Sequence, residues 1–402
     1  MPTKSKTANE ELFDALLRHQ IFLLRYAGQL RNEVWNVLDA TEIDLADKIR
    51  SRLANNAGLR TAVEFRRLEA LMESISKIRG EAWKEAAALM EKQAIQLAQM
   101  EPVFVDDAIR VTMPVVIETV MPTAARLKAI ATKDPFQGRI LSEWAADMEA
   151  DDLRRIHTAI QNGMVAGESM DVIARRVVGT GVLQGTDGVT EMTRRSAATI
   201  TRSAVIDISN RARDEFFHEN SDIVEMERFV ATLDSRTTPI CRANDGKQFP
   251  LGKGPRPILH FNCRSLRIAA LDGILLGNRP AKPYIEKDLV RQYAKENGLG
   301  DISNRDALPR GTKSGFDSWR RGQIRELVGP VPASTTYNEW LKSQSVSFQD
   351  DVLGVDKARL FRDGGLSLDK FVNRNGDELT LAQLAKKERA AFEAAGLNPA
   401  DY

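Results

Sequence analysis

The feature that most constrains the fold is an apolar repeat of helical period in the first quarter of the chain. Between residues 61 and about 100, apolar side chains recur at spacings of three and four, which places them on one face of an α-helix. They are Phe65, Leu68, Leu71, Ile75, Ile78, Trp83, Ala87 and Met90. A helix of about 40 residues is roughly 60 Å long at about 1.5 Å per residue. Helices of this length extend or brace a structure, and they rarely form a small-molecule pocket by themselves.

Similar patterns predict helices on both sides of this run. A first helix is lined by Leu12, Leu16, Leu23, Tyr26, Leu30, Val34 and Leu38. Residues 41–44 form a capping box for a second helix, which residues 55–58 (NNAG) end. Residues 61–64 form a better capping box for the long helix, in which Gly80 marks a point of bending or breakage.

Prolines and glycines punctuate the next hundred residues. Pro102, Pro114 and Pro122 predict short helices or extended pieces between residues 102 and 122. Helical patterns then cover residues 139–162, a short segment capped by Ser169, and residues 190–220. The glycine-rich residues 179–188 are the clearest boundary in this half.

Composition excludes several classes of protein. A net charge of +1 among 402 residues argues against a wholesale nucleic-acid coat, and 43% hydrophobic residues can fill real cores. No apolar run is long enough for a membrane span, and residues 1–11 lack the apolar segment of a secretory signal. Two cysteines fit a reducing compartment such as a host cytoplasm, where a disulfide is disfavoured. We therefore expect an intracellular soluble chain without a membrane partner.

Chemistry-bearing residues are concentrated in residues 229–267, FVATLDSRTTPICRANDGKQFPLGKGPRPILHFNCRSLR. This stretch holds both cysteines, Cys241 and Cys263, and one of the four histidines, His260. It opens with a β-like run at residues 229–233, passes through the turn dipeptide Asp245-Gly246, and closes on a strand-like run at residues 263–268. We expect a compact β element with a long, proline-punctuated loop near residues 227–270.

The order of residues in this stretch resembles the head-morphogenesis domain of tailed phages, the minor head proteins typified by protein F of phage Mu. The pattern is Asp-x-Arg-Thr, Cys-Arg-x-x-Asp-Gly-Lys and Pro-x-x-His-x-x-Cys-Arg. The matching positions are Asp234, Arg236, Thr237, Cys241, Asp245, Gly246, Pro257, His260, Cys263 and Arg264. With the preceding helix, the resemblance covers roughly 80 residues, and so many unlike residue types in one order make it fairly specific.

The resemblance implies a structural minor head protein of a tailed phage or prophage. It implies association with the portal and other capsid components, a few copies per virion, and a role in head assembly, DNA packaging or ejection. It places the protein in the virion head near the portal vertex, after assembly in the host cytoplasm. Phage DNA is left open as a further partner.

Cys241, His260 and Cys263 are candidate ligands for zinc. His-x-x-Cys has the spacing of two ligands on one turn, and a cysteine from across the turn gives three soft or borderline donors. The fourth ligand is missing because Thr238 stands where a Cys-x-x-Cys pair would need a cysteine, so Asp234, Asp245 or water would complete the site. The alternative is that both cysteines are small buried hydrophobic residues and His260 bonds a loop carbonyl. The sequence leaves both open, with no other cofactor expected.

An open zinc site beside an acid also suits a hydrolase, since zinc activates bound water and a carboxylate can take its proton. Asp234, Asp245 and His260 are the only such set here, which gives the alternative function of a zinc-assisted phage nuclease or effector. There is no second histidine, carboxylate cluster, P-loop or catalytic triad near them. We therefore predict no enzymatic activity and no catalytic residues.

Two groups of basic residues are candidates for phosphate contact. Those of the helix at 190–220 are Arg194, Arg195, Arg202, Arg211 and Arg213, which a solvated face with routine ion pairs also explains. Those of the loop are Lys247, Lys253, Arg256, Arg264 and Arg267, in a segment without acidic residues after Asp245. Such a patch suits DNA phosphate or an acidic partner protein equally well.

The other residues of the motif have architectural roles in this interpretation. Gly246 permits a turn that a Cβ would oppose, and Pro257 pre-sets the loop. Asp234 accepts hydrogen bonds from the backbone or Arg236 in an Asx-type turn, and Arg264 pairs with a carboxylate or phosphate.

After residue 271 the pattern predicts a linker at residues 279–283, helices at 284–297, 316–328 and 336–342, and a closing helix at 381–395 that Thr380 and Gln383 cap. Residues 348–366 resemble, less specifically, the C-terminal extension of some phage head proteins. We thus predict a mainly α protein with a small α+β domain: a helical N-terminal region (1–135), a head-morphogenesis domain (136–275) and a helical extension (276–402).

Overall fold

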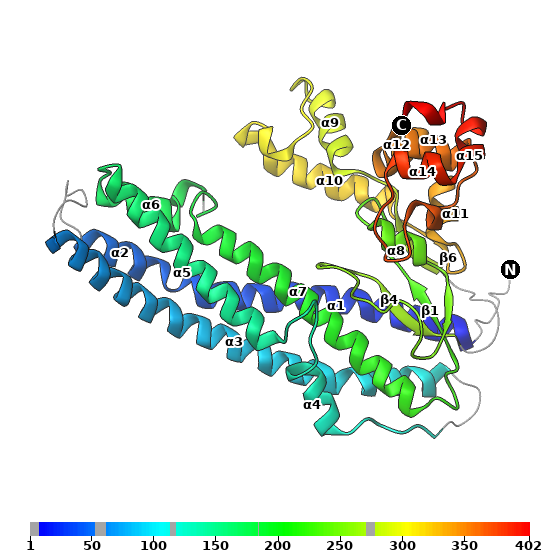
Figure 1. The fold of residues 1–402 in the computed structure, drawn as a ribbon, viewed down its shortest axis with the longest axis horizontal. Helices are drawn as coiled ribbons and strands as arrows, with labels where there is room; N and C mark the ends of the chain where they lie inside the picture. Colours follow the sequence, from blue (N-terminus) through cyan, green and yellow to red (C-terminus); the bar gives the residue numbers. More distant parts are fainter. Residues whose placement is uncertain (1–7, 53–61, 113–117, 184, 271–277) are drawn as a thin grey trace.

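The protein is an arm of long helices that carries two small sheets and a helical C-terminal region at one end (Figure 1). The computed structural model describes residues 8–52, 62–112, 118–183, 185–270 and 278–402. The predicted class, mainly α with a small α+β part, is confirmed. No helix among these ranges is long and apolar enough to cross a membrane.

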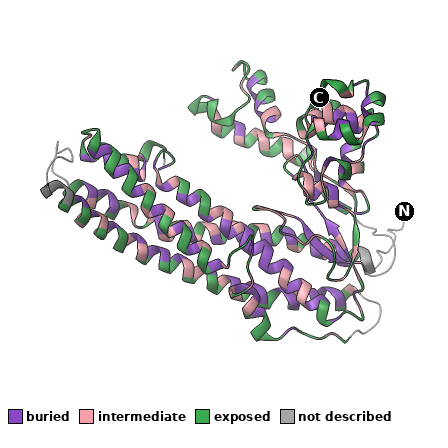
Figure 2. Ribbon diagram, viewed as in Figure 1, coloured by how far each residue is buried: buried purple, intermediate pink, exposed green. Residues whose placement is uncertain are grey.

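Four helices run along the arm: α1 (Ala8–Asp39), α3 (Ala62–Thr112), α5 (Leu141–Val165) and α7 (Thr190–Glu219). Two shorter helices, α2 (Glu42–Arg52) and α6 (Met170–Val178), lie against each other at its far end, and α4 (Ala124–Thr132) packs beside α3 and α7. Their buried stripes face inward in Figure 2, as the apolar periodicity predicts. Ser169 caps α6 through its hydroxyl, also as predicted.

The predicted end of the long helix near Met100 is wrong. Helix α3 has 51 residues and continues through Gly80 and Pro102 to Thr112. Pro102 removes one backbone donor, but Val105 and Ile109 beyond it are buried in the core, and this packing holds the helix together. Gly80 permits a close approach instead of a break, since a Cβ there would lie 3.2 Å from Glu149 Oε1 of α5. The predicted signals at residues 55–58, Thr61 and Pro114 lie outside the described residues.

The central sheet has the order β3-β1-β4, formed by β1 (Met226–Val230), β3 (Gln248–Pro250) and β4 (Leu266–Ala269). Both neighbours of β1 are antiparallel, with Arg228 opposite Gln248 and Ile268. The predicted strand at residues 229–233 lies three residues too late, and the one at residues 263–268 begins three residues too early and ends one residue short, because the edges of β1 and β4 are set by this pairing. The predicted turn at Asp245-Gly246 is present, but it is not a hairpin between two strands: it connects helix α8 (Pro239–Asn244) to β3, and α8 and strand β2 (Leu233–Asp234) lie between β1 and β3.

A second sheet, of order β2-β5-β6, joins this region to the C-terminal part. Strand β5 (Asn278–Lys282) pairs parallel with β2 and antiparallel with β6 (Gly329–Pro332). The prediction of a linker at residues 279–283 is therefore wrong. Pro280 and Pro283 are signals against a strand, but residues 278–282 form one, in which the alternate residues Arg279 and Ala281 are buried.

Helices form most of the remaining C-terminal part. They are α9 (Glu286–Glu296), α10 (Lys313–Leu327), α11 (Tyr337–Lys342), α12 (Val346–Leu353), α13 (Val355–Arg362), α14 (Leu381–Lys387) and α15 (Arg389–Ala394). Single turns of 3-10 helix lie at Gly181–Leu183, Arg305–Ala307, Arg310–Thr312, Leu368–Phe371 and Pro399–Asp401. The predicted capping box of Thr380 and Gln383 is present, but the predicted closing helix is interrupted at Glu388 and forms α14 and α15.

The arm and the central sheet share apolar cores. One cluster runs from Leu23 and Trp83 in the arm through Ile208 of α7 to Phe229 of β1 and Cys263. A second joins the start of α1 and the ends of α3 and α7 to Val230 and Leu266 of the sheet. The sheet is therefore built onto the arm by direct packing. The limits of the three predicted domains stay a prediction.

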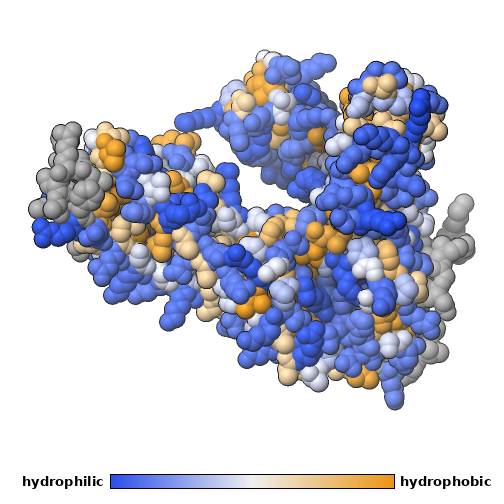
Figure 3. Space-filling model, viewed as in Figure 1, coloured by the Kyte–Doolittle hydropathy of each residue, from blue (hydrophilic) through white to orange (hydrophobic). Residues whose placement is uncertain are grey.

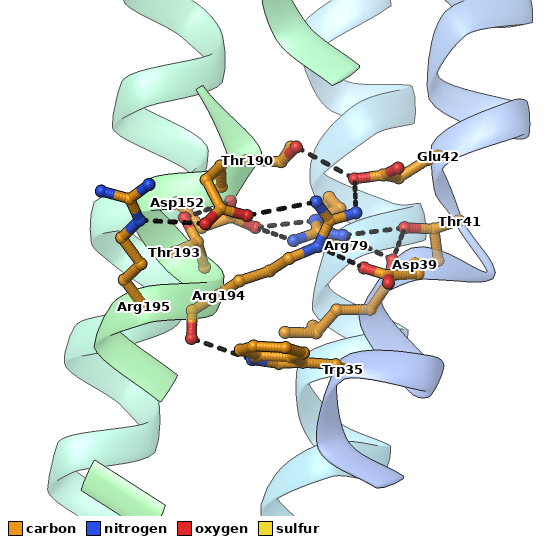
Figure 4. A network of polar contacts seen from close by, with 12 residues as sticks. Trp35, Asp39, Thr41, Glu42, Arg79, Asp152, Thr190, Thr193, Arg194 and Arg195 are labelled. Carbon is orange, nitrogen blue, oxygen red and sulfur yellow. Dashed lines mark hydrogen bonds and ion pairs between the residues drawn. The ribbon is translucent and has the colours of Figure 1, made fainter. Parts of the chain in front are cut away.

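A buried polar network crosses the middle of the arm (Figure 4). The Arg79 guanidinium pairs with Asp152 of α5 at 2.6 Å, and these side chains are 2% and 0% exposed. Asp152 also accepts from Trp83 Nε1 at 3.0 Å and Thr193 Oγ1 at 2.9 Å. Arg79 donates further to the Leu38 carbonyl at 2.9 Å. The network thereby connects α1, α3, α5 and α7 at one level.

Helix α7 does not carry the simple solvated arginine face that the sequence predicts. Arg194 is 8% exposed and pairs with Asp39 and Glu42, both at 2.7 Å. Arg213 is fully buried against Glu101 of α3, which also lies 2.6 Å from His19. Arg195 and Arg211 do form the expected ion pairs along the helix. These buried arginines bind the arm's own carboxylates, because α1 and α3 cover the helix.

Replacing Asp152 by alanine is expected to destabilise the arm strongly. The change leaves Arg79 buried without its carboxylate, which costs about 3–5 kcal/mol. Urea denaturation of the full chain measures the loss. Asp151→Ala is the matched control, since its half-exposed carboxylate pairs with Arg154 and Arg155 at the surface and its removal costs about 0–1 kcal/mol. Equal losses in the two variants would contradict this assignment.

Candidate metal centre

Cys241, His260 and Cys263 lie together beneath the central sheet, where α8 meets the end of the loop between β3 and β4. Thr238 is the N-cap of α8 and Pro239 occupies its first turn, which places Cys241 on the helix's inner side. The loop, residues 251–265, then returns to α8 and delivers His260 and Cys263. Their ligand atoms all lie within 4.8 Å of one another. The structure thus brings together the three residues that the sequence selects.

The atoms of the cluster are close but not covalently joined. Cys241 Sγ lies 3.8 Å from Cys263 Sγ and 3.4 Å from His260 Nε2. Both cysteines are free and buried, at 1% and 0% exposure, while His260 is half-buried. Thr238 Oγ1 lies 2.9 Å from the same histidine nitrogen. Three donors of metal-binding type therefore converge, with a hydroxyl at their edge.

The ring of His260 is oriented by the backbone. Its Nδ1 lies 2.8 Å from the carbonyl oxygen of Phe261, to which it donates as an N–H. In the neutral ring the lone pair is then on Nε2, which faces Cys241 and Thr238, and in the protonated ring Nε2 carries an N–H toward the thiols. A histidine held in this way presents the nitrogen that a metal would use.

The hydrogen bond between the two thiols shifts their pKa values in opposite directions. The hydrogen bond with Cys241 and that with His260 lower the pKa of Cys263 to about 4. The same contact with Cys263, together with burial, raises the pKa of Cys241. The hydrogen bond between His260 and Cys263 raises the pKa of His260. A thiolate stabilised beside an imidazole is the form in which cysteine binds metals.

Asp234 serves the loop framework and lies outside the metal cluster. Its carboxylate accepts from Arg264 Nη2 at 2.8 Å, from the Arg236 backbone N–H at 3.1 Å and from Thr237 Oγ1 at 3.2 Å. This is an Asx-type turn closed by an arginine. Burial alone would raise the pKa of Asp234, but the hydrogen bonds and charge of Arg264 more than offset it, so the pKa lies below its ordinary value.

Asp245 is the junction of the two sheets. One carboxylate oxygen accepts from the Ala231 backbone N–H at 2.6 Å and from Arg279 Nη2 at 3.0 Å. The other accepts from the Tyr337 backbone N–H at 2.6 Å and from Arg279 Nη1 at 3.0 Å. Gly246 follows with φ of +83°, a conformation that suits glycine. Neither Asp234 nor Asp245 belongs to the cluster of Cys241, His260 and Cys263, so of the three fourth ligands that the sequence leaves open only water is compatible with this arrangement.

Three of the five cations in the predicted patch of the loop form ion pairs within the protein. Arg264 pairs with Asp234, Arg267 is 1% exposed and pairs with Glu227, and Arg256 pairs with Glu227 and Asp214. Their partners come from β1, β2 and α7, far from the loop in sequence. Of the five predicted cations, Lys247 and Lys253 are exposed. The three arginines hold the loop to the sheet, and Pro257 lies buried beneath them.

Sequence reasoning missed several residues that complete the site. Arg279 and Tyr337 hold Asp245, Glu227 pairs with two loop arginines, and Thr238 contacts His260. Only Thr238 could have been found from spacing, because it precedes Cys241 by three residues. The others lie in separate strands and helices whose contacts depend on the tertiary fold.

Comparison with known families agrees with the resemblance seen in the sequence. Residues 154–268 match the model of the family described as phage Mu protein F like protein. The chain contains a phage Mu protein F-like domain. The match begins within α5, includes α7 and the central sheet, and ends in β4, so it contains the Cys-His-Cys cluster and lies inside the predicted domain of residues 136–275. No curated protein and no solved structure matches the chain.

The Asp234–Arg264 pair is expected to make stability depend on acid pH. The lowered pKa means that the pair stabilises the fold fully above about pH 4, the ordinary value of an aspartate, and that this contribution is lost as pH falls through the lower folded-state value. Asp234→Asn should cost about 1.5–3 kcal/mol at pH 7. The gap from the wild type should shrink in urea titrations taken below about pH 4.

The control for this experiment is Asp222→Asn, a change at an exposed aspartate of the same domain. It should shift stability by no more than about 0.5 kcal/mol at any pH. A loss in Asp234→Asn that stays constant down to acid pH would contradict a role for its charge.

Proposed function

We propose that the protein is a minor head protein of a tailed phage or prophage that associates with the portal vertex. It is present in several copies per virion and acts in head assembly, DNA packaging or ejection. The observation that carries this proposal is the phage Mu protein F-like domain, which belongs to a head-morphogenesis family. Other virion components are therefore its partners.

The architecture supports a structural role in such an assembly. The F-like domain is built on a helical arm whose cores continue into its sheet, so the domain and the arm form one braced body. Buried ion pairs between helices fix the arm internally. A component that spans between partner subunits needs stiffness of this kind more than it needs a substrate pocket.

The arrangement of the acidic residues supports a role other than catalysis. The alternative of a zinc-assisted nuclease requires a carboxylate free to accept a proton from a metal-bound water. Asp234 is paired with Arg264, and Asp245 is enclosed by Arg279 and two backbone donors. With these carboxylates engaged, no observation favours the hydrolytic alternative, and we propose no enzymatic activity.

The loop arginines also bear on the choice between protein and DNA as the main partner. Arg256, Arg264 and Arg267 are paired internally, which leaves Lys247 and Lys253 as exposed cations of the predicted patch. Two lysines give only a small phosphate-binding term. We therefore propose that contacts with the portal and capsid proteins, and not DNA binding by this loop, place the protein in the head.

This proposal predicts that the chain enters assembling heads through the portal. Coexpression with the portal and capsid proteins of the same phage should yield heads that contain the chain in few copies relative to the major capsid protein. Omission of the portal should remove it from purified heads. Quantitative mass spectrometry of the particles measures both results.

The matched variant is Lys247→Ala with Lys253→Ala. It should enter heads like the wild type, since incorporation depends on protein contacts. Heads and portal complexes that never contain the chain would overturn the proposal. A loss of incorporation in the lysine variant alone, with a steep dependence on salt, would identify a DNA-binding protein instead.

A further inference from the structure

We propose that Cys241, His260 and Cys263 bind one zinc ion, with the fourth position open on the side of Thr238. This inference goes beyond the proposed function and does not rest on it. It rests on the arrangement of the three donors, their burial and the surroundings of the cluster.

The separations of the donor atoms fit a tetrahedral zinc site. With Zn–S near 2.3 Å and Zn–N near 2.0 Å, tetrahedral geometry puts two sulfurs about 3.8 Å apart and a sulfur and a nitrogen about 3.6 Å apart. The structure has 3.8 Å between Cys241 Sγ and Cys263 Sγ, and 3.4 Å between Cys241 Sγ and His260 Nε2. The third separation, between Cys263 Sγ and the ring nitrogen of His260, is at most 4.8 Å, so small side-chain rotations bring all three atoms around one ion.

The chemistry of the donors selects zinc over harder cations. Two cysteine sulfurs and an imidazole nitrogen are the ligand types of structural zinc sites, whereas magnesium and calcium prefer oxygen donors. The cluster has no carboxylate member, since Asp234 and Asp245 are held by Arg264 and Arg279. Two thiolates also balance the charge of one divalent ion, so the buried site would be close to neutral.

The surroundings prepare the ligands for a metal. The Phe261 carbonyl holds the ring of His260 so that Nε2 is directed at the sulfurs. Both cysteines are enclosed by the core that includes Phe229 and Ile258. His260 is half-buried, which gives the ion a path from solvent on its side of the cluster.

Thr238 marks the fourth position. Its Oγ1 lies 2.9 Å from His260 Nε2, at the N-cap of the helix that carries Cys241. Its hydroxyl or a water molecule would complete the coordination; of the fourth ligands that the sequence leaves open (Asp234, Asp245 or water), this keeps water and replaces the aspartates. The ion would tie α8 to the end of the loop of residues 251–265 and so fix the entry to β4.

The first test is elemental analysis of the full chain, purified under reducing conditions and passed over a desalting column. We expect one zinc per chain. Cobalt added to the metal-depleted chain should give the intense thiolate-to-cobalt absorption of a site with two sulfur ligands. A wild-type chain without zinc that also shows no such absorption with cobalt would overturn the proposal.

Single variants then assign the ligands. Cys241→Ser, Cys263→Ser and His260→Asn should each lose the zinc, while His157→Asn, at an exposed histidine of α5, should retain it. Circular dichroism of each variant verifies that the helical arm is folded. Retention of zinc by the folded cysteine variants would place the metal elsewhere and contradict the assignment.

A gain of affinity provides a test that misfolding cannot imitate. Thr238→Cys creates a Cys-x-x-Cys pair with Cys241 and completes four ligands of the closed structural type. In competition with a chelator, zinc should bind this variant about tenfold or more tightly than the wild type, because a thiolate replaces a neutral oxygen. An unchanged affinity would contradict the position assigned to the fourth ligand.

Discussion

The ion pair between Asp245 and Arg279 joins the central sheet to the C-terminal part of the protein. Arg279 is 3% exposed and Asp245 is 7% exposed, so the pair is stable only because nearly every polar atom of it is bonded. Arg279 lies on β5, and the pair bonds to Ala231 directly after β1, to Thr335, and to Tyr337 at the start of α11. Without this pair, the backbone N–H groups of Ala231 and Tyr337 and the carbonyl oxygen of Ala231 would lose their hydrogen-bond partners.

The helices of the arm could be predicted from the sequence because their apolar spacing is a local signal. The helical patterns of α1, α5, α6 and α7 appear in the structure within a few residues of their predicted limits. The continuation of α3 through Pro102 and the strand β5 could not be predicted in this way. In both cases the residues carry local signals against regular structure, and contacts from distant elements, such as the pairing of Ala281 with Leu233, override them.

The candidate site shows the same division. Cys241, His260 and Cys263 could be selected as candidate metal ligands from residue type and spacing, and the fold brings them together. The role of the loop arginines could not be predicted, because the sequence of the loop does not show which carboxylates they pair with. Glu227 and Asp214 lie on β1 and α7, and only the folded chain shows that they neutralise Arg256 and Arg267. The charges of a loop therefore predict its surface charge poorly when carboxylates of neighbouring elements pair with its cations.

The uninterrupted helix α3 also has a mechanical consequence. Its first turns pack in the apolar cluster at the far end of the arm, and its last turns pack against the start of α1 and the central sheet. Packing against other helices along its length resists bending, and at the buried Pro102 the preceding residue, Glu101, pairs with His19 of α1 and Arg213 of α7. A force applied to the far end of the arm is therefore transmitted to the central sheet as a torque, because the helix between them does not bend easily. The arm therefore acts as a lever that turns about the central sheet.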